Sequence, residues 1–262
     1  MSMVGLGVGG LLAAGGAYLA FVQSKKKEGL ARELQFMKST SLPELHESLK
    51  ALDAEGLGDS FRDMVETNGS AETDGELKTP HSETPCAYFE ASVTREYEQM
   101  ETYTDKDGKV RTRRNKLYEN VSSDKSSSPL YIADGGVRAR IDLQGANLDL
   151  KSGEDRYEPF KEDRGYSFFG VNFTVPSGTR TLGFRYKERL IPLGQPLYVV
   201  GEIRKSGGEL RIGKPSEKDK PFIVSVKSEE EVLDSMKGSA KTTQYFGYAL
   251  IVIGAAVAVF LN

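Results

Sequence analysis

The sequence predicts a mainly β protein with some α-helix. In this prediction an antiparallel β sandwich or small barrel, with juxtamembrane helices, lies between two terminal transmembrane helices. Three patterns predict it: an uncharged apolar segment near each end, a helical period after the first segment, and a period of two from about residue 80. Lysine and arginine total 35 against 38 aspartates and glutamates. This balance offers no general attraction to polyanions, so we expect no nucleic-acid partner.

The first apolar segment, residues 4–22, carries no charge but is diluted by six glycines. A helix needs about 20 apolar residues to cross a bilayer, so the segment is long enough to be an anchor. A cleaved signal peptide is the alternative. The segment lacks a positive n-region and a small-residue cleavage site, so we expect an uncleaved anchor.

The second apolar segment, residues 245–261, is rich in large apolar residues and predicts a second transmembrane helix. Small residues recur every four positions in both segments. Such spacing is typical of close helix packing, including helix–helix self-association, although small residues are also simply common in membrane helices. They are Gly5, Gly9, Ala13, Ala17, Gly254 and Ala258.

Basic residues flank only the inner ends of the two segments, which makes an integral membrane protein with two spans the expected arrangement. By the positive-inside rule, residues 23–244 lie in the cytoplasm, across a plasma membrane if the source is prokaryotic. The lipid bilayer is then the first expected partner. The flanking residues are Lys25, Lys26, Lys27, Arg32, Lys237 and Lys241.

Residues 25–58 predict juxtamembrane helices. Leu30, Leu34 and Met37 share one face of the first helix. Ser41 is placed to cap a second helix, with Pro43 in its first turn. The apolar face of that second helix carries Leu45, Leu49 and Leu52, and His46 falls on its polar side.

Residues 60–235 predict the β-rich domain. Alternation over 87–97, a turn at 105–108 and an extended run over 109–121 indicate a hairpin, followed by a polar loop at 122–128. A second hairpin spans 130–143, with Asp134, Gly135 and Gly136 at its tip. Residues 144–180 predict no definite element, apart from an aromatic patch. Further strands are expected at 182–191, 196–203, 209–213 and 221–226, and Ser228 with Glu231 forms a capping box that opens a last helix.

Motifs in a fixed order carry a resemblance to a known family. They are TPCAYFEASV (84–93), IADGGVRARIDLQGANLD (132–149), RYKERLIPLGQPLYVVGEI (185–203), PFIVS (221–225) and SEEEVL (228–233). They resemble the GIDE domain, also called BAM for "beside a membrane", which lies between two transmembrane helices in organelle RING-type ubiquitin ligases and in prokaryotic proteins. The family-motif residues, which we expect to be structural, are Pro85, Cys86, Tyr88, Asp142, Glu188, Pro192, Gly194, Tyr198 and Gly201.

The resemblance implies ubiquitin ligase activity, but the ligase members carry a RING domain after the second helix. A RING holds two structural zinc ions, each with about four cysteine or histidine ligands. This chain contains only Cys86, His46 and His81. We therefore expect the prokaryotic type that lacks the RING, and we expect no metal and no cofactor.

The functional prediction is a membrane-anchored binding or scaffold module without catalytic residues, acting through an unidentified protein partner. The alternative is a RING-type ubiquitin transferase family member, acting in protein ubiquitination or organelle organisation, with any RING supplied by another chain. Mitochondrial relatives place the domain in the intermembrane space, which differs from the orientation expected from the flanking charges.

Two candidate sites remain in the sequence. Cys86 opens a strand among apolar residues, so a buried structural cysteine is favoured over a nucleophile paired with His81. A basic run could bind anionic lipid, but acidic residues on the preceding strand favour cross-strand ion pairs. The run consists of Lys109, Arg111, Arg113, Arg114 and Lys116.

Overall fold

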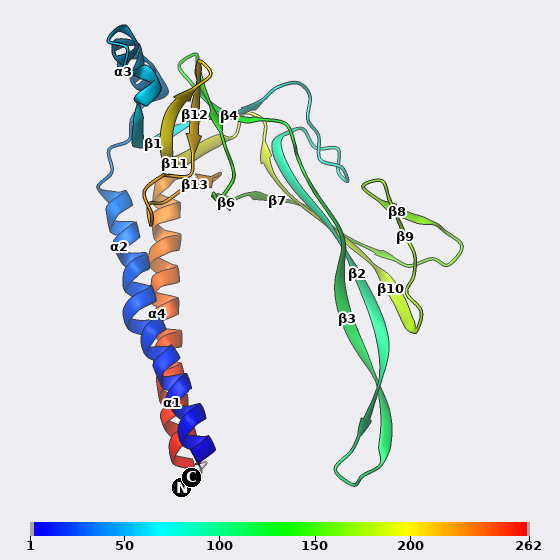
Figure 1. The fold of residues 1–262 in the computed structure, drawn as a ribbon. Coiled ribbons are helices and arrows are strands. Elements are labelled where there is room, and N and C mark those ends of the chain that lie inside the picture. Colours follow the sequence, from blue (N-terminus) through cyan, green and yellow to red (C-terminus); the bar gives the residue numbers. More distant parts are fainter. Residues whose placement is uncertain (1–2, 261–262) are drawn as a thin grey trace.

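A computed structural model describes the backbone of residues 3–260 and the side chains of residues 7–58 and 60–260. Its β-rich part lies at one end of a long pair of helices, and a second sheet extends sideways from that part (Figure 1). The predicted class, mainly β with helices at both ends, is confirmed.

The N-terminal helix is continuous from Met3 to Gln35. It consists of α1 (Met3–Ala17), a π-helical stretch (Tyr18–Gln23) and α2 (Ser24–Gln35). The predicted juxtamembrane helix is therefore an extension of the first apolar segment. The last helix, α4 (Glu229–Phe260), begins at the Ser228 capping box and runs beside the first helix (Figure 1).

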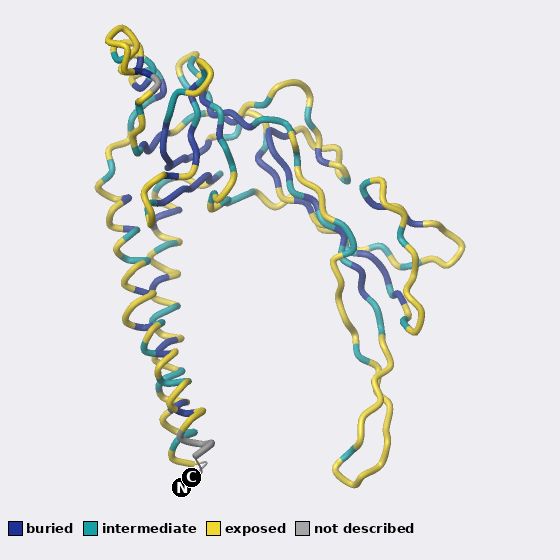
Figure 2. The backbone as a smooth tube through the Cα atoms, in the orientation of Figure 1, coloured by how far each residue is buried: buried dark blue, intermediate teal, exposed yellow. Residues whose placement is uncertain are grey.

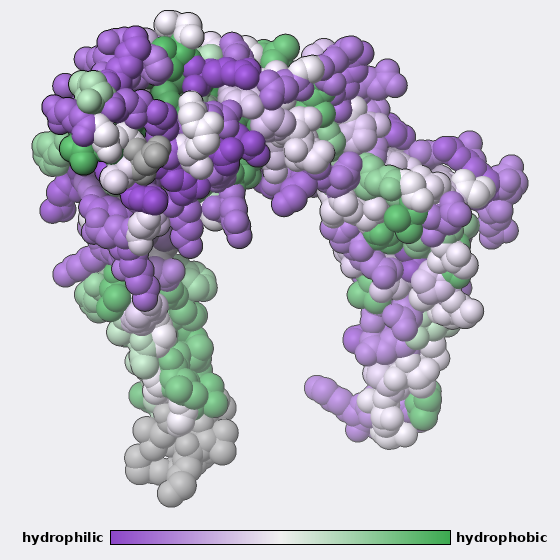
Figure 3. Space-filling model, turned by 45° about the horizontal axis from the view of Figure 1, so that its top comes forward, coloured by the Kyte–Doolittle hydropathy of each residue, from purple (hydrophilic) through white to green (hydrophobic). Residues whose placement is uncertain are grey.

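Residues 7–35 and 229–260 form two helices that are long and apolar enough to cross a membrane. Apolar side chains gather on the helix pair, while hydrophilic ones cover the β-rich part (Figure 3).

The other juxtamembrane helix, α3 (Leu42–Ala54), begins as predicted. The Ser41 side chain accepts from the Glu44 backbone N–H, and Glu44 in turn accepts from the Ser41 backbone. Leu45 and Leu49 are buried against the β-rich part, and Leu52 is half-buried. A single turn of 3₁₀ helix, Gly58–Ser60, then leads into the first strand.

Five strands close into a small barrel. The sheet order is β1-β4-β5-β12-β11, and β1 also pairs with β11, which closes the ring; β13 and β6 add to the sheet beyond β11. Buried aliphatic side chains from all five strands, including Val65, Ile132 and Ile203, fill its interior. The strands are β1 (Arg62–Thr73), β4 (Leu130–Asp134), β5 (Val137–Ile141), β6 (Asn147–Asp149), β11 (Pro196–Ser206), β12 (Glu209–Gly213) and β13 (Ile223–Ser225).

A separate four-stranded antiparallel sheet has the order β3-β2-β10-β7. The small hairpin β8–β9 and neighbouring aromatic side chains pack on one of its faces, around Phe184. The strands are β2 (Cys86–Thr104), β3 (Val110–Lys125), β7 (Lys151–Pro159), β8 (Tyr166–Phe168), β9 (Val171–Phe173) and β10 (Thr179–Pro192).

Strands β2 and β3 continue beyond the end of β10, whose last partner on β2 is Gln99. We call residues 96–119 the hairpin arm; they comprise the last positions of β2 that pair with β10, the facing part of β3 and the hairpin beyond them. Most of the arm is exposed (Figure 2), and its free end points the same way as the two chain ends (Figure 1).

Three sequence expectations were wrong or incomplete. The polar loop expected at 122–128 is strand as far as Lys125, because β3 is an edge strand exposed on both faces and lacks the alternation that marks a half-buried strand. Strand β1 was not expected, since polar residues dominate Arg62–Thr73. The stretch 144–180 contains β6, β7, β8 and β9.

Candidate functional site

A groove of about 830 Å³ lies where the barrel meets the four-stranded sheet. Tyr88 reaches it from the start of β2, and Ser126–Ser128 from the connection between β3 and β4. Arg140 comes from β5, Arg204 from β11, and Lys214 follows β12. We call this site the basic groove.

A single carboxylate, that of Asp142, is shared among three arginines, of which Arg140 and Arg204 line the groove. Its Oδ2 lies 2.8 Å from Arg204 Nη2, and its Oδ1 lies 3.7 Å from Arg140 Nε and 3.9 Å from Arg211 Nη1. Lys214 forms no ion pair within the described residues and is exposed. The groove therefore carries more positive charge than its own acid neutralises.

Uncharged polar groups line the same groove. The side chains of Ser127, Ser128 and Gln144 have no hydrogen-bond partner within the described part of the chain. Half-buried Pro129 and Leu143 supply apolar surface beside them. Guanidinium, ammonium, hydroxyl and amide donors over an apolar base can bind an oxyanion together with the carbon chain that bears it.

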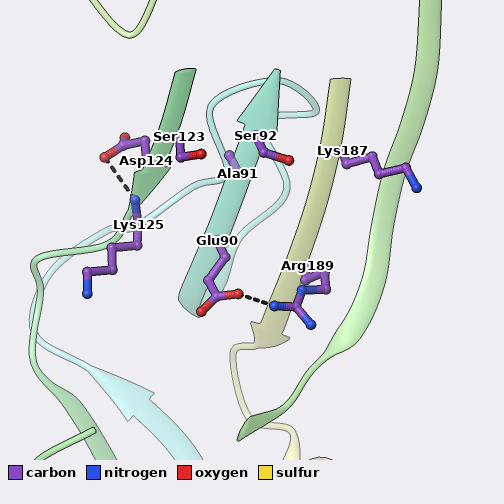
Figure 4. A pocket seen from close by; sticks show the side chains of 8 residues that line it. All are labelled: Glu90, Ala91, Ser92, Ser123, Asp124, Lys125, Lys187 and Arg189. Atoms are coloured by element: carbon purple, nitrogen blue, oxygen red, sulfur yellow. Dashed lines mark hydrogen bonds and ion pairs between the residues drawn. The ribbon is translucent and has the colours of Figure 1, made fainter. Parts of the chain in front are cut away.

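A second hollow, of about 500 Å³, lies on the exposed face of the four-stranded sheet (Figure 4). Glu90 on β2 pairs with Arg189 on β10, and Asp124 accepts a hydrogen bond from the backbone N–H of Lys125. Lys187 is held 3.5 Å from Asp155. Two of its three cations, Arg189 and Lys187, are held in ion pairs, so the hollow offers less free positive charge to a ligand than the basic groove does.

Cys86 is buried, with only 1% of its surface exposed, and it packs with Phe89, Ala91 and Leu190. Burial, together with the charge of Glu188, raises the pKa of its thiol to about 11. A thiol in this setting stays protonated at neutral pH, which fits the structural role expected from the sequence.

Glu188 holds the loop that precedes β2. Its carboxylate accepts hydrogen bonds from the His81 N–H at 2.6 Å and from the Ser82 N–H and hydroxyl at 3.3 and 2.6 Å. Burial opposes the charged form, but the bonds from Ser82 and His81 outweigh it and lower the pKa of Glu188. The His81 ring lies between Phe169 and Tyr186, and burial lowers its pKa.

The other family-motif residues lie at strand ends and close contacts. Pro85 precedes β2, Pro192 ends β10, and Gly194 occupies the turn to β11 with a φ of 71°. A Cβ at Gly201 would lie 2.9 Å from the Gly213 carbonyl oxygen, so this barrel contact needs glycine. Tyr198 is buried where α4 begins.

The basic run lies on the hairpin arm, opposite acidic residues. Arg113 pairs with Glu101 at 2.8 Å and Lys116 with Glu96 at 2.7 Å; Arg114 lies 3.9 Å from Glu98, and Arg111 contacts Asp105. Only Lys109 of the run has no ion pair within the described residues. The arm has six acidic and six basic residues, so cross-strand pairing describes it better than an anionic-lipid patch does.

Sequence reasoning did not single out the basic groove. Arg140 is distant in the sequence from Arg204 and Lys214, and it meets them only because β5, β12 and β11 are neighbours in the barrel. The one local signal is the alternation of Arg138 and Arg140 along β5. In the described part of the chain, no group of three or more histidine, cysteine, aspartate or glutamate side chains could hold a metal ion.

The GIDE family model, described as an E3 ubiquitin ligase, matches residues 98–260. E3 ubiquitin-protein ligase SPL1 of Arabidopsis thaliana is 30% identical over 129 residues, covering 48% of this chain and 37% of its own length. E3 ubiquitin-protein ligase SP1 of the same plant is 30% identical over 129 residues, covering 48% of this chain and 36% of its own.

The match thus spans little more than a third of the length of these curated relatives. No solved structure matches the chain. The family model covers more than half of the chain, from within the hairpin arm through β3 to β13 and on to the end of α4. The chain therefore belongs to the GIDE family of E3 ubiquitin ligases.

Proposed function

We propose that this chain is a membrane-anchored binding module of the GIDE family, which holds a protein partner beside a bilayer without catalytic chemistry of its own. The observation that carries the proposal is the antiparallel helix pair. It places two apolar helices side by side, with the β-rich part at one end and both chain ends at the other (Figure 1).

Local chemistry supports a binding role over a catalytic one. Cys86 is buried with a raised pKa, and Glu188 is occupied by backbone and hydroxyl donors. Neither side chain is available as a nucleophile or a general acid in this arrangement. The basic groove, in contrast, presents free donors to solvent.

Ubiquitin transfer is the second candidate, favoured by the family and by the names of the plant relatives. The 262 residues hold one cysteine and two histidines, fewer than a zinc-bound RING needs. In this candidate the RING therefore comes from another chain or from residues outside these 262, and the GIDE domain contributes placement at the membrane.

Affinity capture of the full chain from detergent extracts tests both candidates, with partners identified by mass spectrometry and the two helices alone as the control. We expect a protein recovered with the full chain and not with the helices. A RING protein or a ubiquitin-conjugating enzyme among the specific partners would favour the second candidate. Recovery of nothing beyond the control would contradict the binding role.

A further inference from the structure

We propose that the basic groove binds a short acidic segment of a protein partner. This inference rests on the proposed binding function, and it names the chemistry of the partner. The groove is built from barrel residues, from the start of β2 and from the connection between β3 and β4.

The first step is charge. Arg140, Arg204 and Lys214 line the groove, and Asp142 is the only acidic residue among its lining side chains. Arg204 holds Asp142 closely, whereas Arg140 lies 3.7 Å from it and keeps a side chain that is 38% exposed. Arg140 and Lys214 can therefore donate to an incoming anion without breaking a short ion pair.

The second step is size and shape. A volume of about 830 Å³ is far more than one phosphate or carboxylate fills, and it lies in the usual range for an organic ligand. The free hydroxyls of Ser127 and Ser128 and the amide of Gln144 can pair with backbone groups of an extended peptide. Half-buried Pro129 and Leu143 give its apolar side chains a surface to pack on.

The third step is the choice among anions. Polynucleotide binding needs several phosphate contacts, and the groove offers three cations on a chain of net charge −3. A carboxylate matches the planar fork of Arg140, and neighbouring backbone amides match the hydroxyls. The donor set thus fits an acidic peptide better than a bare anion.

The test selects peptides from a displayed library of short random sequences on the full chain held in detergent. We expect the selected peptides to be enriched in aspartate and glutamate. The groove variants are Lys214→Gln alone and Arg140→Gln with Lys214→Gln. Lys218→Gln and Arg138→Gln are matched controls, because these residues are exposed, belong to the same segments and lie outside the groove.

A selected peptide is then synthesised with its glutamates intact or replaced by glutamine, and its affinity is measured. We expect the double variant to lose about tenfold or more in affinity, the size expected for lost charge-assisted hydrogen bonds, and the controls to match the parent chain. The glutamine peptide should bind the parent chain as weakly as the acidic peptide binds the double variant. Lys214→Gln alone should also weaken peptide binding. It removes an unpaired, exposed charge, so this loss of affinity cannot reflect a failure to fold.

Three results would overturn the assignment: a selection without acidic enrichment, equal binding by groove and control variants, or displacement of the peptide by inorganic phosphate or phosphatidylglycerol vesicles at low concentration. The two proposals fail separately. Partner capture that survives the groove substitutions would reject the groove and keep the binding function. Acidic peptides bound at the groove without any captured partner would keep the groove assignment and reject the binding function.

Discussion

Buried glutamates in this protein have opposite electrostatic settings, which the residue type alone does not reveal. Glu66 on β1 is 1% exposed and sits near Glu229 of α4 and Tyr198 of β11, with its Oε2 atom unpartnered within the described residues. Burial, and then the charge of Glu229, raise its pKa to about 7. Glu202 on β11 accepts hydrogen bonds from Ser216, which outweigh burial and lower its pKa.

The raised pKa of Glu66 predicts a stability that falls as pH rises. Folded and unfolded chains both hold the proton below about pH 4.5, but between 4.5 and 7 only the folded chain does. The free energy of unfolding therefore decreases across that window and stays lower above it. Glu66→Gln should remove this loss and raise the free energy of unfolding by about 2–3 kcal/mol at pH 8. Melting followed by circular dichroism in detergent, at pH 5 and pH 8, measures it.

Glu202→Gln is the matched control, because its pKa is lowered rather than raised. A group of this kind contributes stability above its unfolded pKa and loses that contribution as the pH falls. Glu202→Gln should therefore destabilise the protein at pH 8, in the opposite sense to Glu66→Gln. A Glu66→Gln variant that melts below the parent chain at pH 8 would show that the ionised carboxylate is favourable in the fold.

At the scale of elements, glycines bring the two long helices into backbone contact. A Cβ at Gly9 would lie 2.5 Å from the Gly254 carbonyl oxygen, and one at Gly247 would lie 2.6 Å from that of Gly16. The small-residue spacing in the two apolar segments thus serves packing within one chain, and Ala258 adjoins Gly9 as part of it. The surroundings of Gly5 lie outside the described side chains.

Gly247→Leu should separate the helices, because no rotamer avoids the facing backbone of Gly16 and Ala20. Phe21 and Tyr248 lie across the pair with ring centroids 5.8 Å apart. With cysteines at these two positions, a short bismaleimide should cross-link the parent chain within one molecule, and the yield should fall to near background in Gly247→Leu.

Gly238→Ala provides the control for the helix pair, since a Cβ there meets nothing within 4 Å. It should leave the cross-link intact and favour the helix by about 1 kcal/mol. Undiminished cross-linking in Gly247→Leu would mean that the contact at Gly16 does not determine the pairing.

At the scale of the whole molecule, the antiparallel helices put both chain ends together, away from the β-rich part (Figure 1). If the pair crosses a bilayer, the two ends share one side and the β-rich part lies on the other. The hairpin arm extends from the β-rich part in the same direction as the two helices (Figure 1). Its six acidic and six basic residues exclude it from the hydrocarbon of a bilayer. In a bilayer the arm therefore has to stay with the β-rich part.

Flanking charges predict that the β-rich side is cytoplasmic. Single cysteines at Ser2, Glu55 and Asp107 should report it when an impermeant maleimide is applied to intact cells. We expect labelling of Ser2→Cys alone, with Glu55→Cys and Asp107→Cys labelled only after permeabilisation. The native Cys86 is buried and should stay silent. External labelling of Glu55→Cys would reverse the orientation, and external labelling of Asp107→Cys alone would place the arm across the membrane.

The sequence by itself determined the features that depend on local pattern. The two apolar segments, the Ser41 and Ser228 caps and most strands of the domain follow from hydropathy periods and capping residues, which act over a few positions. The family followed as well, because its motifs are contiguous runs. The pairing of the arm was predictable because its two strands are joined by a single short turn.

Only the tertiary structure decided what depends on distant residues meeting. The residues of β1 are mostly polar, yet the strand closes the barrel by pairing with β4 and β11. Its position is therefore set by its partner strands and not by its own hydropathy pattern. The raised pKa of Glu66 needs Glu229, far along the chain, to lie beside it. The basic groove likewise exists because β5, β12 and β11 are neighbours: three separate cations become one site only when the barrel closes.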